Sequence, residues 1–204
     1  MILVVIVIFR QDGYTQNNLV AENGQDQDSY PEGEEDEKQT MPECEYPVQV
    51  GDECGGGTVF YVGSQFGGEG TNALIAYEED EDERLMWGFH GENIQGADNT
   101  TYGYENTKIL SEKGSPIATL CWDKTSYGYD DWYLPASREL FEIRRNSNEV
   151  GSDVLDGFVP FRYWSSTHAD PENAMSVYFE FNQIARFNKR AEARARCIRS
   201  VSLD

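Results

Sequence analysis

The chain has 204 residues, which suffices for one domain of ordinary size and a tail, and nothing in it requires a second core. Its formal net charge of −21 and pI near 4.3 argue against nucleic acid and anionic membranes as partners, because an acidic field repels polyphosphate. The charge is uneven, since ten of the 16 Lys and Arg residues lie from Arg138 onward and six of these fall in the last twenty residues. The C-terminal end is therefore locally basic.

The first 47 residues divide into two predicted segments. Met1–Phe9 is aliphatic, too short to span a bilayer, and lacks the flanking residues of a signal peptide. We interpret residues 1–10 as a targeting or anchor remnant or as an added strand. Residues 11–47 are acidic and polar with little to bury, which predicts a flexible acidic linker ahead of a single domain at residues 48–204.

The domain opens with patterns typical of short strands. Gly55–Gly57 permits a tight turn, Thr58–Val62 predicts a strand, and Ala73–Tyr77 predicts its hairpin partner. Glu78–Glu83 contains six consecutive acids, which predicts a solvated loop, with a cation site as the alternative. The Gly-, Asn- and Asp-rich stretch Trp87–Tyr104 predicts a long irregular region.

The middle of the chain predicts the helices. Asn106–Glu112 and Pro116–Trp122 can each form a short helical segment. Trp132–Leu134 predicts a strand, which Pro135 ends because proline lacks the N–H that a strand ladder needs. A helix follows, with Ser137 as its expected cap, and runs to about residue 147.

The last third predicts a loop at Asn146–Gly157, apolar residues from 158 to 161 that lead into the next motif, and two strands. Ala174–Phe181 alternates, so that Met175, Val177, Phe179 and Phe181 are expected to face the core and Ser176, Tyr178 and Glu180 the solvent. The final strand is expected at Arg194–Val201.

The four cysteines lack the short spacings of zinc or redox sites, and their even number indicates disulfides and an oxidising compartment. Three pairings are open from the sequence alone. A local pair, Cys44–Cys54, would close a short loop and leave Cys121–Cys197 as the second bridge. Four reduced thiols in a cytosolic protein are the alternative.

Catalytic motifs are not apparent in the sequence. The two histidines, His90 and His168, lie far apart and in no recognisable motif. Thr167, His168 and Asp170 are close in sequence, but adjacent strand residues point to opposite faces, whereas a triad needs side chains that converge. We therefore expect no catalytic residue and no cofactor, with a structural calcium ion as the alternative.

Five motifs occur in one order along the chain: Gly-Gly-x-Val-Phe-Tyr-Val near residue 59, a cysteine at 121, Asp-Trp-Tyr-Leu-Pro-x-x-x-Glu-Leu at 131–140, Tyr-Trp-Ser-Ser-Thr at 163–167, and Arg-Cys-Ile-Arg at 196–199. Together they resemble the Lcl C-terminal-domain family over about three quarters of the chain. One departure is Ala136, where the family usually has a serine in a capping box with the glutamate.

The resemblance implies an α+β, C-type-lectin-like fold with small antiparallel sheets, two or three short helices and long ordered loops. It also favours the Cys121–Cys197 bridge. Members include domains of bacterial collagen-like adhesins and variable proteins of diversity-generating retroelements, so a non-enzymatic recognition module at a cell or virion surface is expected, in an extracellular or surface location. A lectin-type calcium site is not expected, because the string Pro171-Glu172-Asn173 has the wrong order and no Trp-Asn-Asp occurs.

The resemblance places the ligand surface on the C-terminal strands and loops, with protein or glycan as the ligand. Carried over to this chain, the expected ligand-binding residues are Ser165, Thr167, His168, Asp170, Asn173, Ser176, Tyr178, Glu180, Asn182, Arg186, Asn188, Lys189 and Arg190. One alternative is an adhesin that binds sulfated polysaccharide through Arg186, Lys189, Arg190 and Arg194. Another is an assembly subunit, oligomeric or anchored in a membrane, that uses the apolar N-terminal segment.

Overall fold

The computed structural model describes residues 41–81, 83–149 and 161–204. The predicted N-terminal segment at residues 1–10, most of the linker, and Phe158 and Val159 lie outside these ranges. None of the helices in the described ranges is both long and apolar enough to cross a membrane. The elements are β1 (Glu53–Cys54), β2 (Gly57–Gly63), β3 (Asn72–Ala76), β4 (Leu85–Met86), α1 (Gly103–Glu112), α2 (Pro116–Trp122), α3 (Ser137–Glu149), β5 (Arg162–His168), β6 (Asn173–Tyr178), β7 (Gln183–Asn188), β8 (Glu192–Ala193) and β9 (Ile198–Ser202).

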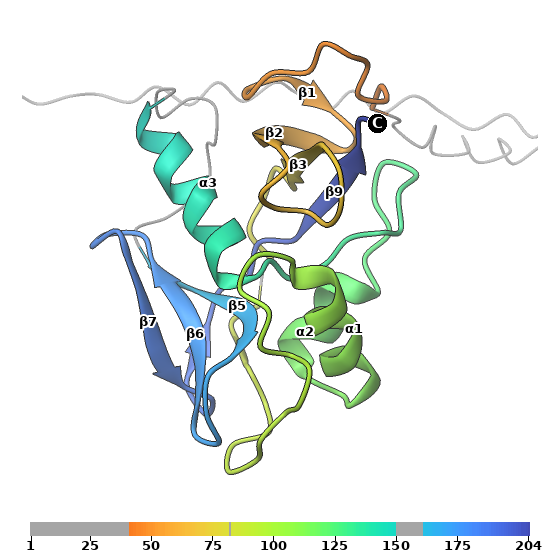
Figure 1. Cartoon of the computed structure of the whole chain (residues 1–204). Helices are drawn as coiled ribbons and strands as arrows, with labels where there is room; N and C mark the ends of the chain where they lie inside the picture. Colours follow the sequence, from red (N-terminus) through yellow and green to blue (C-terminus); the bar gives the residue numbers. More distant parts are fainter. Residues whose placement is uncertain (1–40, 82, 150–160) are drawn as a thin grey trace, which may run out of the picture. The chain divides into compact units, whose positions relative to one another are not determined.

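The first sheet has the order β1-β2-β3-β9, and all of its pairs are antiparallel. Gly55 and Gly56, at φ +59° and +90°, make the return from β1 to β2 in a region of backbone space that glycine enters freely. The predicted turn, strand and hairpin partner are confirmed. The last strand of the chain closes this sheet beside β3, so the chain end returns to its first hairpin (Figure 1).

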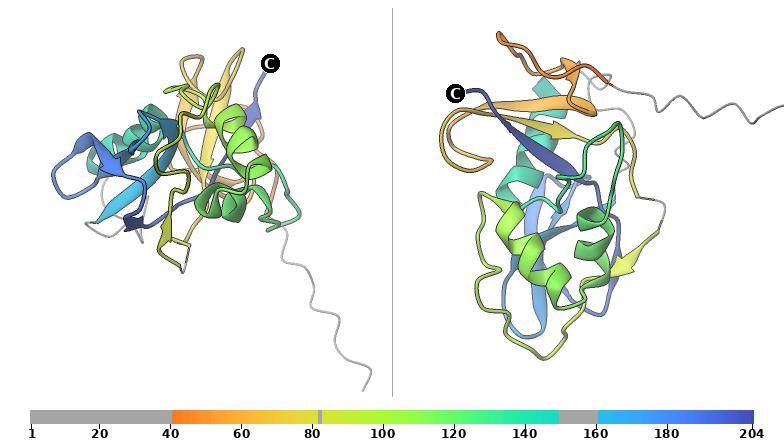
Figure 2. Two further views of the ribbon diagram at one scale, coloured as in Figure 1. Left: turned by 90° about the horizontal axis from the view of Figure 1, so that it is seen from below. Right: turned by 90° about the vertical axis from the view of Figure 1, so that its right-hand side faces the viewer.

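A three-stranded sheet, β5-β6-β7, and a two-stranded sheet, β4-β8, complete the strands of the described part. Leu140 and Ile143 of α3 are buried in one cluster with Phe60 of β2 and Val177 of β6. Helix α3 therefore packs against both the first sheet and the β5-β6-β7 sheet. Figure 2 (right view) shows the first sheet at one end of this domain and α1 and α2 at the other.

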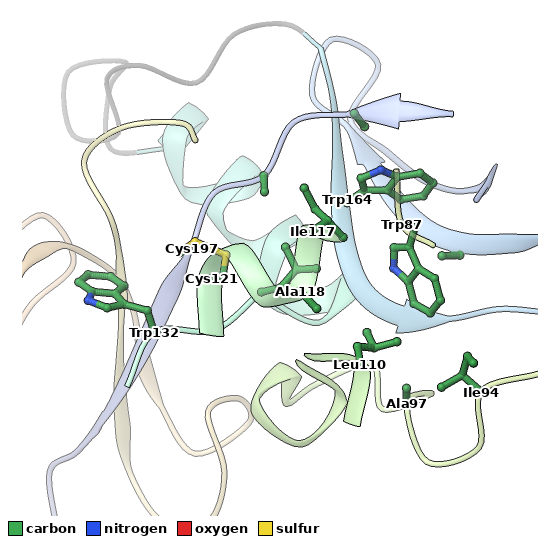
Figure 3. Close-up of a cluster of buried hydrophobic side chains, with 14 residues drawn as sticks. Trp87, Ile94, Ala97, Leu110, Ile117, Ala118, Cys121, Trp132, Trp164 and Cys197 are labelled. Carbon is green, nitrogen blue, oxygen red and sulfur yellow. A yellow bond between two sulfur atoms is a disulfide. The ribbon is translucent and has the colours of Figure 1, made fainter. Parts of the chain in front are cut away.

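The largest core cluster joins α1 and α2 to the strands. It contains Trp87, Trp132 and Trp164, all fully buried, together with Leu110 of α1 and Ile117 of α2 (Figure 3). Both helices were expected from the sequence, although α1 begins three residues earlier than predicted. These helices supply the apolar faces that cover the irregular loop between residues 87 and 102.

Two disulfides close the domain, in the pairing that the resemblance favours. Cys121 on α2 bonds Cys197, which immediately precedes β9, across 76 residues (Figure 3). Cys44 bonds Cys54 of β1, and Gly55 N–H donates to the Pro42 carbonyl at 2.7 Å. The chain is therefore attached to the first sheet from residue 42 onward.

The stretch before α3 differs from the prediction in two ways. The expected strand at Trp132–Leu134 is a single isolated bridge between Tyr133 and Ile198, because Pro135 and the turn into α3 leave no room for a longer ladder. The expected cap at Ser137 was wrong, since Ser137 is the first helical residue. Its N–H donates instead to Thr167 Oγ1 at 3.0 Å, a cap supplied by β5.

Glu139 keeps half of a capping box even though Ala136 has replaced the serine. Its Oε2 accepts the Ala136 N–H at 2.8 Å and the Gly103 N–H at 2.9 Å, and its Oε1 accepts the Tyr133 hydroxyl at 3.1 Å. One fully buried carboxyl thus joins the starts of α1 and α3. The helix continues to residue 149, so the loop expected at Asn146–Gly157 does not begin at residue 146, and the rest of that stretch lies outside the described residues.

The predicted alternation along Ala174–Phe181 was wrong at two positions, Ser176 within β6 and Phe181 beyond its end. Ser176 is 0% exposed, because its Oγ donates to the Ala185 carbonyl and accepts from Arg162, whereas Phe181 lies beyond the strand end and is 62% exposed. The cause is that this sheet is covered on both faces: Val177 packs with α3, and Ala174 packs with Trp164 and the tryptophan cluster. A strand between two packed layers does not alternate cleanly.

The predicted final strand at Arg194–Val201 is also divided. Residues 194 to 197 lie between β8 and β9 and connect different sheets. Arg196 is buried there, and its guanidinium donates to the carbonyls of Tyr77 and Glu78 and to Asp80. The acidic run is therefore not simply a solvated loop, because Asp80 is an internal partner of the C-terminal arginines.

Candidate functional site

The residues that sequence predicted for ligand binding fall into three groups in the structure. Four of them are buried and make internal hydrogen bonds: Ser165, Thr167, Ser176 and Lys189. Lys189 Nζ donates to the Glu92 carbonyl at 2.9 Å and lies 4.9 Å from the centroid of the Trp87 ring. Burial lowers the pKa of Lys189. These four residues support the scaffold and offer no exposed contact group.

The second group lies together at the β5–β6 turn and the end of β7. Arg186 Nη1 is 3.2 Å from Asp170 Oδ2, and Asp170 also accepts the backbone N–H groups of Glu172 and Asn173. Asn188, His168 and Arg190 belong to the same end; Asn188 Nδ2 lies 3.4 Å from His90 Nε2, and His168 Nε2 lies 3.4 Å from Asn93 Oδ1. Burial, and then the charge of Lys189, lower the pKa of His168.

The third group, Tyr178, Glu180 and Asn182, lies at the opposite end of the β6–β7 hairpin. Tyr178 donates to Glu180 Oε2 at 3.1 Å, and Asn182 has a φ of +52° in the turn. The hydrogen bond to Glu180 raises the pKa of Tyr178. The hairpin therefore separates the predicted residues into two surfaces, of which this one borders a pocket.

The pocket has a volume of about 300 Å³ and lies between the start of β5, the end of β6 and the β4–β8 pair. We call it the arginine–aromatic pocket, and it is lined by Arg84, Phe161, Arg162, Tyr178, Glu192, Ala193 and Arg194. Two of these residues, Tyr178 and Arg194, were expected from the sequence to bind a ligand. Arg84 follows the acidic run, and Phe161 and Arg162 directly precede the Tyr-Trp-Ser-Ser-Thr motif, so no motif distinguished them.

Aromatic rings hold the three guanidinium groups of the pocket in place. Arg162 lies over the rings of Tyr178 and Phe187, with Cζ 4.8 and 4.5 Å from their centroids. Arg84 and Arg194 both lie over Phe161, at 4.9 and 5.5 Å. Such stacking restrains the side chain while leaving N–H groups free for a ligand.

Exposed apolar side chains lie in or beside the same pocket. Among the described residues, the large apolar side chains that are exposed are Tyr46, Met86, Phe161 and Phe181. Phe161 lines the pocket, Phe181 packs edge-on against Tyr178 with ring centroids 4.6 Å apart, and Met86 is the cross-strand neighbour of Glu192. Three of these four exposed side chains therefore line the pocket or adjoin one of its lining residues.

The part of the chain that the structure describes has no evident set of ligands for a metal ion and no free thiol. No group of three or more histidine, cysteine, aspartate or glutamate side chains there could hold a metal ion. All four cysteines are in disulfides. What the pocket offers chemically is positive charge beside exposed aromatic rings, which suits noncovalent recognition of an anion.

The elements of the described residues define an α+β domain with three helices, small antiparallel sheets and two disulfides. The family model of the Lcl C-terminal domain matches residues 78–199, more than half of the chain, and the chain therefore belongs to that family. No curated protein matches the chain.

Among solved structures, the chain is similar to a fimbrial protein from Bacteroides ovatus ATCC 8483, with 14% sequence identity and a TM-score of 0.47. The similarity covers 74% of this chain and 45% of the fimbrial protein chain. The chain thus spans less than half of that protein's length.

Proposed function

We propose that this domain is a non-enzymatic recognition module that binds a ligand at the arginine–aromatic pocket. The observation that carries the proposal is that Arg84, Arg162 and Arg194 line one cavity together with exposed Phe161. Exposed Phe181 packs against Tyr178 of the same lining. In a chain of net charge −21, a cationic pocket attracts anionic groups that the rest of the surface repels.

The state of the titratable groups supports binding rather than catalysis. Glu139 and Tyr133 have raised pKa values because they are buried, and both are engaged in the junction of α1 and α3. His168 Nε2 faces Asn93 at the hairpin end, away from the arginine–aromatic pocket. Glu139 and Tyr133 thus belong to the scaffold, and the raised pKa of Tyr178 in the pocket comes from its hydrogen bond to Glu180. No reacting constellation is required to explain these shifts.

We place the domain outside the cytoplasm, at a cell or virion surface or secreted. The two disulfides support this location, because such bonds persist in oxidising compartments. We also propose that the fold is C-type-lectin-like, which the family membership, the small sheets and the long irregular loop at residues 87–102 support.

The test is a ligand screen of the intact chain against arrays of glycans and displayed peptides, with and without chelator. Arg84→Gln removes one pocket charge, while Arg138→Gln removes an exposed arginine of α3 outside the pocket. We expect ligands whose binding is lost with the first change and kept with the second. Ligands that respond equally to both, or a substrate turned over by the chain, would refute the proposal.

Sulfated polysaccharide is a second candidate ligand, favoured by the three pocket arginines. The residues first expected for it are not equivalent, since Lys189 is buried and Arg186 is paired with Asp170. Arg194 lines the pocket and Arg190 is exposed. Binding to heparin should weaken steeply with salt if this candidate is correct, and binding that is unchanged by moderate salt would reject it.

A further inference from the structure

We infer that the arginine–aromatic pocket receives a segment of a protein partner in which a carboxylate lies next to large apolar side chains. The inference rests on the proposed recognition function and names the class of its partner. Three features of the pocket support this partner: the kind of apolar groups at its rim, the arrangement of its cations, and its size.

The rim is apolar in the manner of a protein interface. Phe161, Phe181 and Met86 are 44%, 62% and 46% exposed, and none of these side chains has a polar group with which to bind a sugar hydroxyl. Aromatic residues, methionine and arginine are the residue types enriched where proteins bind one another. A partner that covers this rim with apolar side chains removes all three from water.

The cations of the pocket suit a carboxylate. A guanidinium presents paired N–H donors in a plane, which match two oxygens of a carboxylate as they match those of a sulfate, and the apolar rim favours the carboxylate of a protein segment. Arg162 already uses Nη1 for Ser176 Oγ at 3.0 Å and is held between two rings, so its position is fixed before a ligand arrives. Arg194 Nη1 lies 3.5 Å from Asp80 Oδ2, which orients this guanidinium from behind the pocket, and Glu192 is the one acid among the described lining residues.

The size of the pocket favours a side-chain anchor over a row of sugar rings. A volume of about 300 Å³ lies at the small end for ligand sites and suits one or two side chains. Because stacking already orders the arginines, little side-chain entropy is lost when an anchor enters. An acidic side chain in the pocket with apolar neighbours over Phe161 and Phe181 satisfies all three features.

Two probes separate this inference from the broader proposal. One is a fluorescent peptide of alternating glutamate and leucine or phenylalanine, and the other is a heparin fragment of equal charge. Binding of each to the intact chain is measured by fluorescence anisotropy. We expect the peptide to bind at least tenfold more weakly to Arg84→Gln and to Phe181→Ser than to the unaltered chain.

The controls are matched in chemistry and lie outside the pocket. Arg138→Gln removes an exposed arginine, and Tyr46→Ser removes an aromatic side chain that is 84% exposed. Both should leave peptide binding within twofold, and thermal unfolding followed by circular dichroism verifies that every variant folds. A peptide in which lysine replaces glutamate should not bind.

Failure of this inference can be distinguished from failure of the proposed function. If the heparin fragment binds in a manner that Arg84→Gln abolishes and the acidic peptide does not bind, the protein-segment inference is overturned while recognition at the pocket stands. If the peptide binds but is unaffected by Arg84→Gln and Phe181→Ser, the inference is overturned as well. If neither probe binds and the ligand screen shows nothing that depends on Arg84, both the inference and the proposed function fail.

Discussion

Arg196 and Asp80 form a buried ion pair, in which Nε and Nη2 of Arg196 lie 2.9 and 2.8 Å from Oδ1 of Asp80. The other carboxylate oxygen of Asp80 accepts the Tyr163 hydroxyl at 2.6 Å and lies 3.5 Å from Arg194 Nη1. Asp80 therefore connects the acidic run to β5 and to the arginine–aromatic pocket. Arg196 is held in the core because this partner and two backbone carbonyls satisfy it.

Asp80→Asn should destabilise the domain by about 3 kcal/mol, because it leaves the buried charge of Arg196 without its counter-ion. The measurement is chemical unfolding at neutral pH. Glu79→Gln makes the same charge change at an exposed neighbour in the acidic run and should shift stability by less than about 0.5 kcal/mol. Equal effects of the two changes would show that the Asp80–Arg196 ion pair stabilises the domain no more than an exposed carboxylate does.

The stability of the domain should fall as the pH rises from about 4.5 to about 7 because of Glu139. Burial raises the pKa of Glu139 to about 7, even though the N–H groups of Ala136 and Gly103 and the hydroxyl of Tyr133 act in the opposite direction. The folded state thus holds a proton that the unfolded state has released. This contribution is fully present below the unfolded pKa and is lost as the pH rises through the folded pKa.

Glu139→Gln isolates that contribution from the other carboxylates of the chain. Between pH 5 and pH 7.5, the unaltered chain should lose about 2 to 3 kcal/mol more unfolding free energy than the variant does. Parallel pH profiles for the two proteins would contradict a raised pKa at Glu139.

Thr167→Val should destabilise the fold by about 1 to 2 kcal/mol and leave ligand binding by folded protein unchanged. The hydroxyl of Thr167 caps the Ser137 N–H in a buried hydrogen bond and donates to the Asn99 carbonyl at 2.8 Å in a partly buried one. Thermal unfolding together with a binding isotherm tests this. Thr125→Val, at an exposed threonine, is the matched control. Loss of affinity without loss of stability would indicate that Thr167 contacts the ligand.

Replacing both members of a disulfide with alanine should cost more for Cys121–Cys197 than for Cys44–Cys54. In the chain-entropy model, closure across 76 residues stabilises by about 4 to 5 kcal/mol and closure across 10 residues by about 3 kcal/mol. Chemical unfolding of the two double variants gives the comparison. A larger cost for the local bridge would indicate that strain or residual structure outweighs loop entropy.

Much of the fold could be predicted from the sequence because it is encoded locally. Gly55 and Gly56 require a turn, α2 begins at Pro116 after a serine cap, and two apolar runs form the strands of the β2–β3 hairpin. The alternation of β6 could not be interpreted correctly, since whether Ser176 faces water depends on the second layer that covers the sheet. That layer comes from distant parts of the chain, and no local sequence pattern predicts it.

The candidate site was less predictable than the fold. Tyr178 was expected at a binding surface, and it does border the pocket. Arg84, Phe161 and Arg162 became neighbours only through the pairing of β4 with β8 and of β5 with β6. A basic C-terminal end is visible in the sequence, but its buried members, Lys189, Arg196 and Arg199, cannot be distinguished there from the exposed ones.

The most direct measurement is a map of chemical-shift changes in the isotope-labelled chain when a ligand selected from the peptide and glycan arrays is added. Recognition at the arginine–aromatic pocket predicts that the largest changes occur at Arg84, Phe161, Tyr178 and Arg194. Changes confined to the opposite end of the hairpin, around His168 and Asp170, would place recognition elsewhere and contradict the account.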